Sequence, residues 1–76
     1  GIMTIIASDC VINMEQVQLI HMENGDLVFD VIDGAIRLTN CPENALPQIA
    51  MAIAQDKKFL EMEDAKLVVT GGTNED

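Results

Sequence analysis

An Asn-Gly pair between two runs of strand-forming residues most narrows the folds open to this chain. Asn24 and Gly25 separate residues 17–22 from residues 27–32, and both runs are rich in β-branched and aliphatic residues. A type I′ turn needs positive φ at both central residues, and Asn-Gly adopts that conformation readily. We therefore predict a hairpin with a two-residue loop. Its register pairs Glu23 with Asp26, Met22 with Leu27, Ile20 with Phe29 and Leu19 with Asp30.

A second two-residue turn, at Asp33-Gly34, extends the hairpin to a third strand. With this loop, Asp30 lies opposite Arg37, and the two side chains form an ion pair. Because side chains alternate across a pleated sheet, the two turns also align the apolar residues on the opposite face. The sequence therefore predicts a three-stranded antiparallel meander. Its central apolar row contains Ile20, Phe29 and Leu38.

Asn44 and Pro47 locate the start of a helix. A helix capped by Asn44 places Pro47 in the first turn, where the missing N–H is tolerated. We predict a helix from Ala45 to Lys58, packed on one face of the meander. Residues 45–55 contain no charge, whereas a surface helix normally has a charged outer face. The side expected to face the core contains Leu46, Ile49, Ala50, Ile53 and Lys57.

The remaining segments complete a small α+β fold. Short strands are predicted at 3–7, 10–13 and 66–70, and residues 59–62 are either a strand or a fraying helix end. We expect these terminal strands to extend the sheet, within a single domain that spans residues 1–70. Residues 71–76 are polar, and we expect a disordered tail there. We interpret Gly1 and Ile2 as a cloning remnant before a natural start at Met3.

The charge balance limits the classes of partner. Four basic residues against thirteen acidic ones give a net charge of −9. Nucleic-acid binders and proteins that bind anionic membranes normally carry a basic patch, so we expect neither direct nucleic-acid binding nor membrane binding. No apolar run approaches the roughly 20 residues that a membrane span needs. We expect a protein partner, and a basic protein is one class that this charge would attract.

Few side chains in this sequence could carry chemistry. His21 could approach Asp30 on a two-strand diagonal, but Ser8, the only serine, lies outside the predicted meander. Cys10 and Cys41 lack the close pairing that zinc sites use. We interpret both cysteines as reduced thiols in a cytoplasmic protein. We therefore expect no enzymatic activity, no cofactor and no metal.

The apolar residues exceed what one thin core can hold. A chain of this length buries only about 60% of its unfolded surface, and one helix covers only one face of a sheet. We therefore predict a small, acidic, non-enzymatic protein–protein interaction module that forms a homo-oligomer. Because the net charge opposes association, we expect the contact to avoid Glu61, Glu63 and Asp64. The residues expected at the contact are Val17, Leu19, Val28, Ile32 and Met51.

The net charge also supports a second hypothesis. A small acidic protein of the phage type can mimic nucleic acid and occupy a basic groove of a nucleic-acid-processing enzyme. That function needs carboxylates along one continuous face, whereas the charges predicted here fall in turns and termini. The distribution of acidic side chains on the surface separates the two hypotheses.

Overall fold

The hairpin predicted at Asn24-Gly25 is present in the computed structural model, which describes residues 2–69. Strand β3 (Leu19–Glu23) pairs with β4 (Asp26–Val31) in the predicted register, with Ile20 opposite Phe29 and Met22 opposite Leu27. Asn24 has a φ of 52° and Gly25 a φ of 83°, as a type I′ turn requires. Local turn chemistry therefore sets this part of the fold.

The predicted second turn is wrong by one position. The loop consists of Ile32 and Asp33, and β4 pairs with β5 (Gly34–Thr39) so that Val31 lies opposite Gly34. Gly34 has a φ of 156°, which L-residues rarely adopt, so the glycine is used just after the loop. The register changes by two residues, and side chains keep their faces because they alternate with a period of two. Ile36 therefore takes the place of Leu38 opposite Phe29.

The predicted Asp30–Arg37 ion pair is consequently wrong. Asp30 lies opposite Ala35, and Arg37 lies opposite Val28. The Arg37 guanidinium instead donates to the Asp26 carboxylate at 3.0 Å and to Glu23.

Helix α1 (Ala45–Ala54) begins where predicted but ends before Lys58. The predicted cap is wrong, because the Asn44 side chain makes no capping hydrogen bond and instead accepts from the Gln48 side chain at 2.7 Å. Asp56 has a φ of 56°, and its N–H donates to the Ile53 carbonyl at 3.0 Å. The Lys57 N–H donates to the Ala52 carbonyl at 2.9 Å. These two bonds form a Schellman motif, which ends the helix and reverses the chain.

The terminal segments form a second sheet rather than extending the meander on both sides. Strand β1 (Thr4–Ile6) pairs antiparallel with β2 (Val11–Asn13) and parallel with β6 (Phe59–Glu61). Residues 59–61 are therefore a strand and not a helix end. Only β7 (Lys66–Leu67) joins the meander, beside β5. The sheet orders are β2-β1-β6 and β3-β4-β5-β7.

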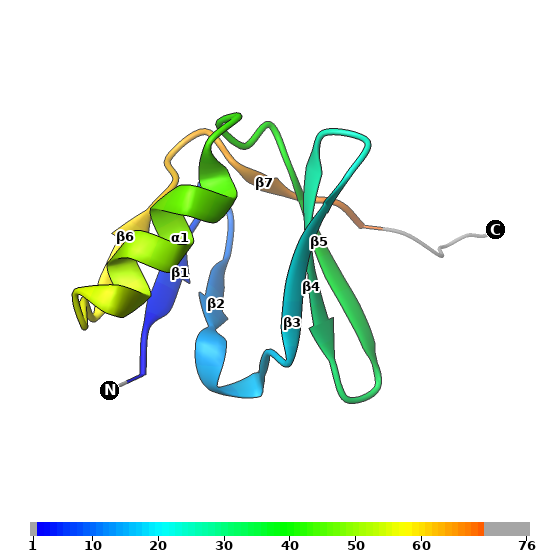
Figure 1. The fold of residues 1–76 in the computed structure, drawn as a ribbon. Coiled ribbons are helices and arrows are strands. Elements are labelled where there is room, and N and C mark those ends of the chain that lie inside the picture. Colours follow the sequence, from blue (N-terminus) through cyan, green and yellow to red (C-terminus); the bar gives the residue numbers. More distant parts are fainter. Residues whose placement is uncertain (1, 70–76) are drawn as a thin grey trace, which may run out of the picture.

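A short 3-10 helix, η1 (Met14–Gln16), separates the two sheets along the chain. The Asn13 side chain accepts a hydrogen bond from the Glu15 N–H at 3.0 Å and caps η1. The chain therefore turns after β2, and β3 starts a new sheet (Figure 1).

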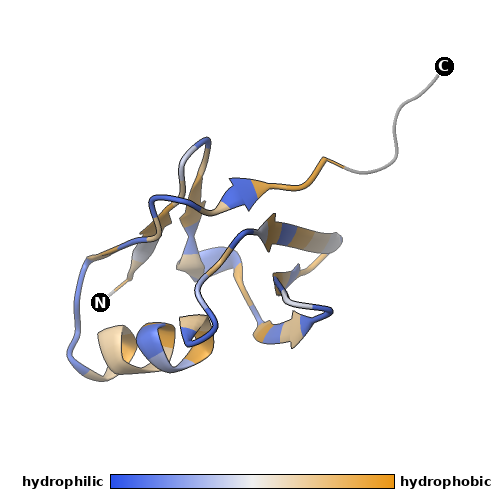
Figure 2. Cartoon of the chain, turned by 90° about the horizontal axis from the view of Figure 1, so that it is seen from above, coloured by the Kyte–Doolittle hydropathy of each residue, from blue (hydrophilic) through white to orange (hydrophobic). Residues whose placement is uncertain are grey.

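The core lies between the two sheets and α1, so the predicted α+β fold is confirmed. Viewed from above, the helix lies along one side of the molecule and the strands lie on its other sides (Figure 2). No polar or charged side chain among residues 2–69 is buried. The predicted tail at 71–76 lies outside the described residues. The largest fully buried side chains are Phe29, Ile5, Leu27, Leu38 and Ile49.

Replacing Gly25 with Val is expected to destabilise the fold by roughly 1–3 kcal/mol, because a β-branched residue resists positive φ. No atom lies within 4 Å of the position that a Cβ would take, so backbone conformation alone causes the loss. Chemical denaturation measures the free energy of unfolding. Gly25→Asn is the control and should cost less, because Asn tolerates this region. Equal losses for the two variants would contradict the assigned turn.

Candidate functional site

Helix α1 exposes apolar side chains on both of its flanks. It buries Ala45, Ile49 and Ala52 against the core, a spacing of four and then three residues along one side. Met51 is 58% exposed and Ile53 is 55% exposed. The predicted inward side is therefore wrong for Ala50, Ile53 and Lys57, which face solvent, and it left out Ala52, which is buried. The charge-free run contributes an apolar surface as well as part of the core.

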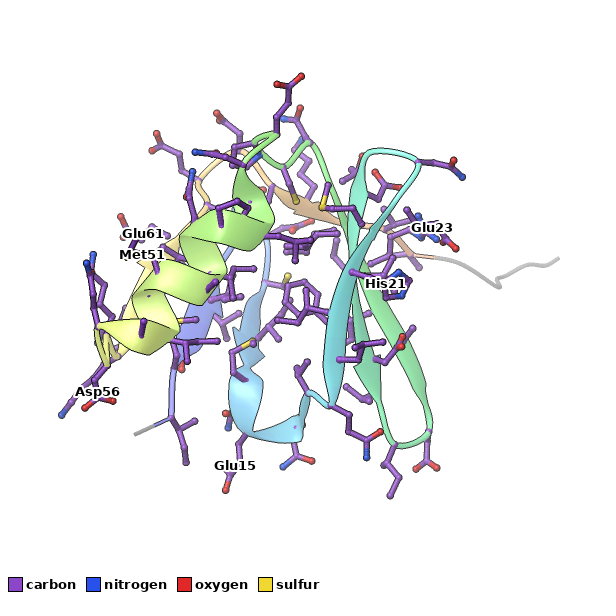
Figure 3. The ribbon with its side chains drawn as sticks, in the orientation of Figure 1. Glu15, His21, Glu23, Met51, Asp56 and Glu61 are labelled. Carbon is purple, nitrogen blue, oxygen red and sulfur yellow. The ribbon has the colours of Figure 1, made fainter. Side chains whose placement is uncertain are left out.

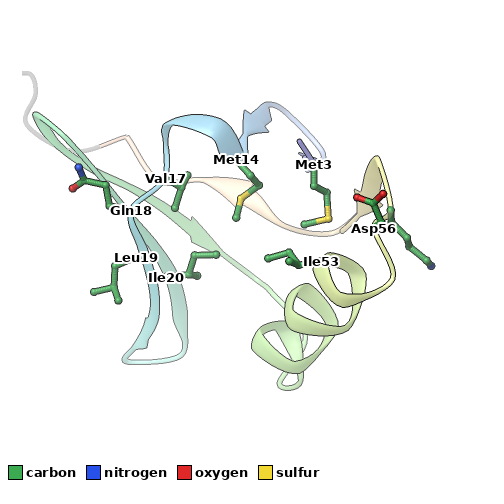
Figure 4. Close-up of a pocket in the computed structure, with 9 residues that line it drawn as sticks. Met3, Met14, Val17, Gln18, Leu19, Ile20, Ile53 and Asp56 are labelled. Atoms are coloured by element: carbon green, nitrogen blue, oxygen red, sulfur yellow. The ribbon is translucent and has the colours of Figure 1, made fainter. Parts of the chain in front are cut away.

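An apolar groove of about 450 Å³ lies between the end of α1 and the start of β3 (Figure 4). Ile53 lies on the helix side, Ile20 on the β3 side, and Met14 of η1 between them. The Asn13 cap positions η1, and with it Met14, against this groove. The other lining residues are Met3, Val17, Gln18, Leu19, Asp56 and Lys57.

The five residues predicted at the contact do not form one patch. Val17 is partly buried against the core and lines the groove, and Leu19 is 57% exposed at the same groove. Met51 lies on α1, on the flank nearer β6, where it lines a second groove with Leu60. Ile32 is 81% exposed in the β4–β5 turn. Val28 is only 5% exposed.

Polar side chains from both neighbouring strands lie beside Val28 on the outer face of the meander. Val28 is opposite His21 on β3 and opposite Arg37 on β5. The hydrogen bond from Arg37 to Asp26 makes the largest contribution to raising the pKa of the guanidinium above its ordinary value, and the hydrogen bond from Arg37 to Glu23 makes the second largest. These side chains give the outer face a polar surface over a buried valine.

The predicted approach of His21 to Asp30 is present, with Nε2 and Oδ1 separated by 3.7 Å. Both side chains are well exposed to solvent. The Ser8 hydroxyl donates to the Ala65 carbonyl at 2.7 Å, so it is committed to the backbone near β7. The Ser8 hydroxyl is therefore bonded to the segment that precedes β7 and not to the His21–Asp30 pair.

The two cysteines are partly buried free thiols. Burial is the main cause that raises the pKa of Cys10, and the charge of Asp9 adds to it. Burial also raises the pKa of Cys41, and a hydrogen bond with the Leu27 backbone opposes that shift. Within residues 2–69, no group of three or more His, Cys, Asp or Glu side chains is placed to hold a metal ion.

The acidic side chains are spread around the molecule. In Figure 3, Glu15 lies at the bottom of the molecule and Glu23 at the right, whereas Asp56 and Glu61 both lie at the left. Glu15 belongs to η1, Glu23 ends β3, and Glu61 ends β6. These four carboxylates therefore do not share one side of the fold, whereas Glu61, Glu63 and Asp64 line one pocket together.

No protein-family model, curated protein or solved structure matches this chain. In the described part of the chain, no helix has the length and apolar character needed to cross a membrane.

Removing the Arg37–Asp26 contact should reveal favourable coupling between the two side chains. A double-mutant cycle with Arg37→Ala and Asp26→Ala measures it, and we expect the coupling to weaken in salt because both groups are partly exposed. The matched cycle with Arg37 and Asp30 should give no coupling. Stronger coupling to Asp30 than to Asp26 would contradict the observed register.

Both thiols should react with iodoacetamide more slowly in the folded protein than in the urea-unfolded chain at pH 8. A raised pKa leaves a smaller fraction of each cysteine as the reactive thiolate at that pH, and partial burial limits access. Mass spectrometry of the labelled peptides measures Cys10 and Cys41 separately. Equal rates in the folded and unfolded states would show that neither thiol is protected.

Proposed function

We propose that this chain is a small, non-enzymatic protein–protein interaction module that associates with a second copy of itself. The observation that carries the proposal is the surface of α1, which exposes Met51 and Ile53 from a helix without any charged residue. Exposed apolar surface of this kind commonly marks a site of protein contact. Self-association would remove these exposed apolar side chains from water.

The balance of forces favours α1 as part of the contact. Each copy carries a net charge of −9, so two copies repel each other at most orientations. The charge-free helix lowers that repulsion where it faces a second copy. Burial of apolar area contributes roughly 25 cal/mol per Å², before the cost of association is subtracted. An interface of about 800 Å² per partner is ordinary for a stable complex.

The distribution of carboxylates supports this function over nucleic-acid mimicry. A mimic needs acidic groups along one face, as the phosphates of nucleic acid are. Glu15, Glu23 and Asp56 lie at three different edges of the molecule, which favours a dispersed charge over one acidic face (Figure 3). We further propose a reducing, cytoplasmic location, which suits two free thiols.

Self-association is tested by sedimentation over a dilution series. The native chain should form a dimer or larger species at micromolar concentration. The double variant Met51→Glu/Ile53→Glu should shift to monomer, because it adds charge to the apolar surface. Ile32→Glu is the control: the sequence placed Ile32 at the contact, but it lies in the exposed β4–β5 turn and not on α1, so the present proposal leaves it outside the contact. Monomer mass for the native chain at high concentration would overturn the proposal.

A further inference from the structure

We infer that the second copy docks by antiparallel pairing of its β6 strand with β6 of the first copy. The inference rests on the proposed self-association and identifies how the two copies meet. It predicts a continuous six-stranded sheet across a two-fold axis, with the order β2-β1-β6 in each half.

Strand β6 is an edge strand with outward-facing backbone groups. The Lys58 carbonyl accepts the Thr4 N–H at 2.9 Å, and the Met62 N–H donates to the Ile6 carbonyl at 2.8 Å. Residues 58, 60 and 62 therefore direct their backbone groups toward β1. Because backbone groups alternate along a strand, those of Phe59 and Glu61 point away from β1. This edge is a template for another strand.

One two-fold register pairs all four of these outward groups. With Leu60 on the axis, the Phe59 N–H donates to the Glu61 carbonyl of the second copy, and the Glu61 N–H of that copy donates back to Phe59. Symmetry repeats both bonds. An antiparallel pair that exchanges both hydrogen bonds has this geometry.

The charges that flank β6 are complementary under the same symmetry. Two of the four basic residues of the chain, Lys57 and Lys58, come directly before β6. Glu61 is the last residue of β6, and Glu63 and Asp64 follow it; we call these three residues the acidic run. Antiparallel pairing brings the lysines of each copy beside the acidic run of the other. Opposite charges across an interface favour association and fix its register. This docking departs from the expectation that the contact avoids Glu61, Glu63 and Asp64.

The pairing also covers one flank of α1. Leu60 packs against the core on the face of the first sheet where α1 lies, and α1 contacts β6. A two-fold axis perpendicular to the sheet keeps both helices on that face. Met51 shares a groove of about 370 Å³ with Lys57 and Leu60 on the β6 side of the helix. Ile53 lines the groove on the β3 side and lies away from the axis. Met51, but not Ile53, therefore approaches the second copy.

Charge reversal tests the pairing directly. Lys57→Glu/Lys58→Glu places like charges across the axis, and so does Glu61→Lys/Glu63→Lys. Each variant alone should dimerise at least about tenfold more weakly, measured by sedimentation. An equimolar mixture of the two should restore dimers, because opposite charges then meet at both ends of the paired strands. Lys66→Glu reverses an exposed lysine on β7 and should leave dimerisation unchanged.

The two flanks of α1 supply a second, independent readout. Met51→Glu and Ile53→Glu make similar changes at similar exposure on one helix. Only Met51→Glu should weaken dimerisation substantially, and circular dichroism confirms that each variant folds. A native dimer that the charge reversals do not weaken, or that the mixture does not restore, would overturn β6 pairing while leaving self-association intact. A native chain that stays monomeric would overturn both.

Discussion

Burial of Phe29 by two sheets and one helix is the interaction on which the rest of the structure depends. Phe29 of β4 is fully buried in one cluster with Ile5 of β1 and Ile49 of α1. Residues of both sheets and of α1 bury one another in this cluster, and a chain of this length buries only about 60% of its unfolded surface, so each sheet relies on the shared core. The helix fills its share of that core mostly with small residues, Ala45 and Ala52. Ile49 is the large α1 side chain that is fully buried, whereas Met51 and Ile53 face solvent and form the apolar surface on which the proposed function rests.

The sequence predicted those parts of the fold that short-range chemistry decides. Asn24-Gly25 has the positive φ values of its turn, and α1 begins after Asn44, although the Asn44 side chain makes no capping hydrogen bond. The second turn was placed one residue too late because Asp33-Gly34 fits two arrangements. The two residues can form the loop themselves, as predicted, or Gly34 can directly follow a loop formed by Ile32 and Asp33, as observed. Alternation did not reveal the error, since a two-residue change of register keeps every side chain on its face. The end of α1 depends on positive φ at Asp56, a residue type that gives little signal for that conformation.

The candidate site was less predictable because it depends on contacts between distant segments. Leu19 and Met51 are exposed, whereas Val28 is buried beside the polar side chains of the outer meander face. The groove between α1 and β3 is lined by Met14, which the 3-10 helix η1 positions after β2. The hydrophobic periodicity of the sequence does not predict that position. The lysines and the acidic run around β6 are visible in the sequence. Their complementarity has meaning only once β6 is known to pair with β1 and to form an edge.

Amide hydrogen exchange at β6, measured at low and high protein concentration, tests the central claim most directly. The Phe59 and Glu61 amides point away from β1 and should exchange quickly in dilute protein, then slowly once the second copy pairs with them. The Met62 amide, bonded to the Ile6 carbonyl at 2.8 Å, is an internal reference that should be protected at both concentrations. Exchange at Phe59 and Glu61 that stays fast in concentrated protein would contradict the account.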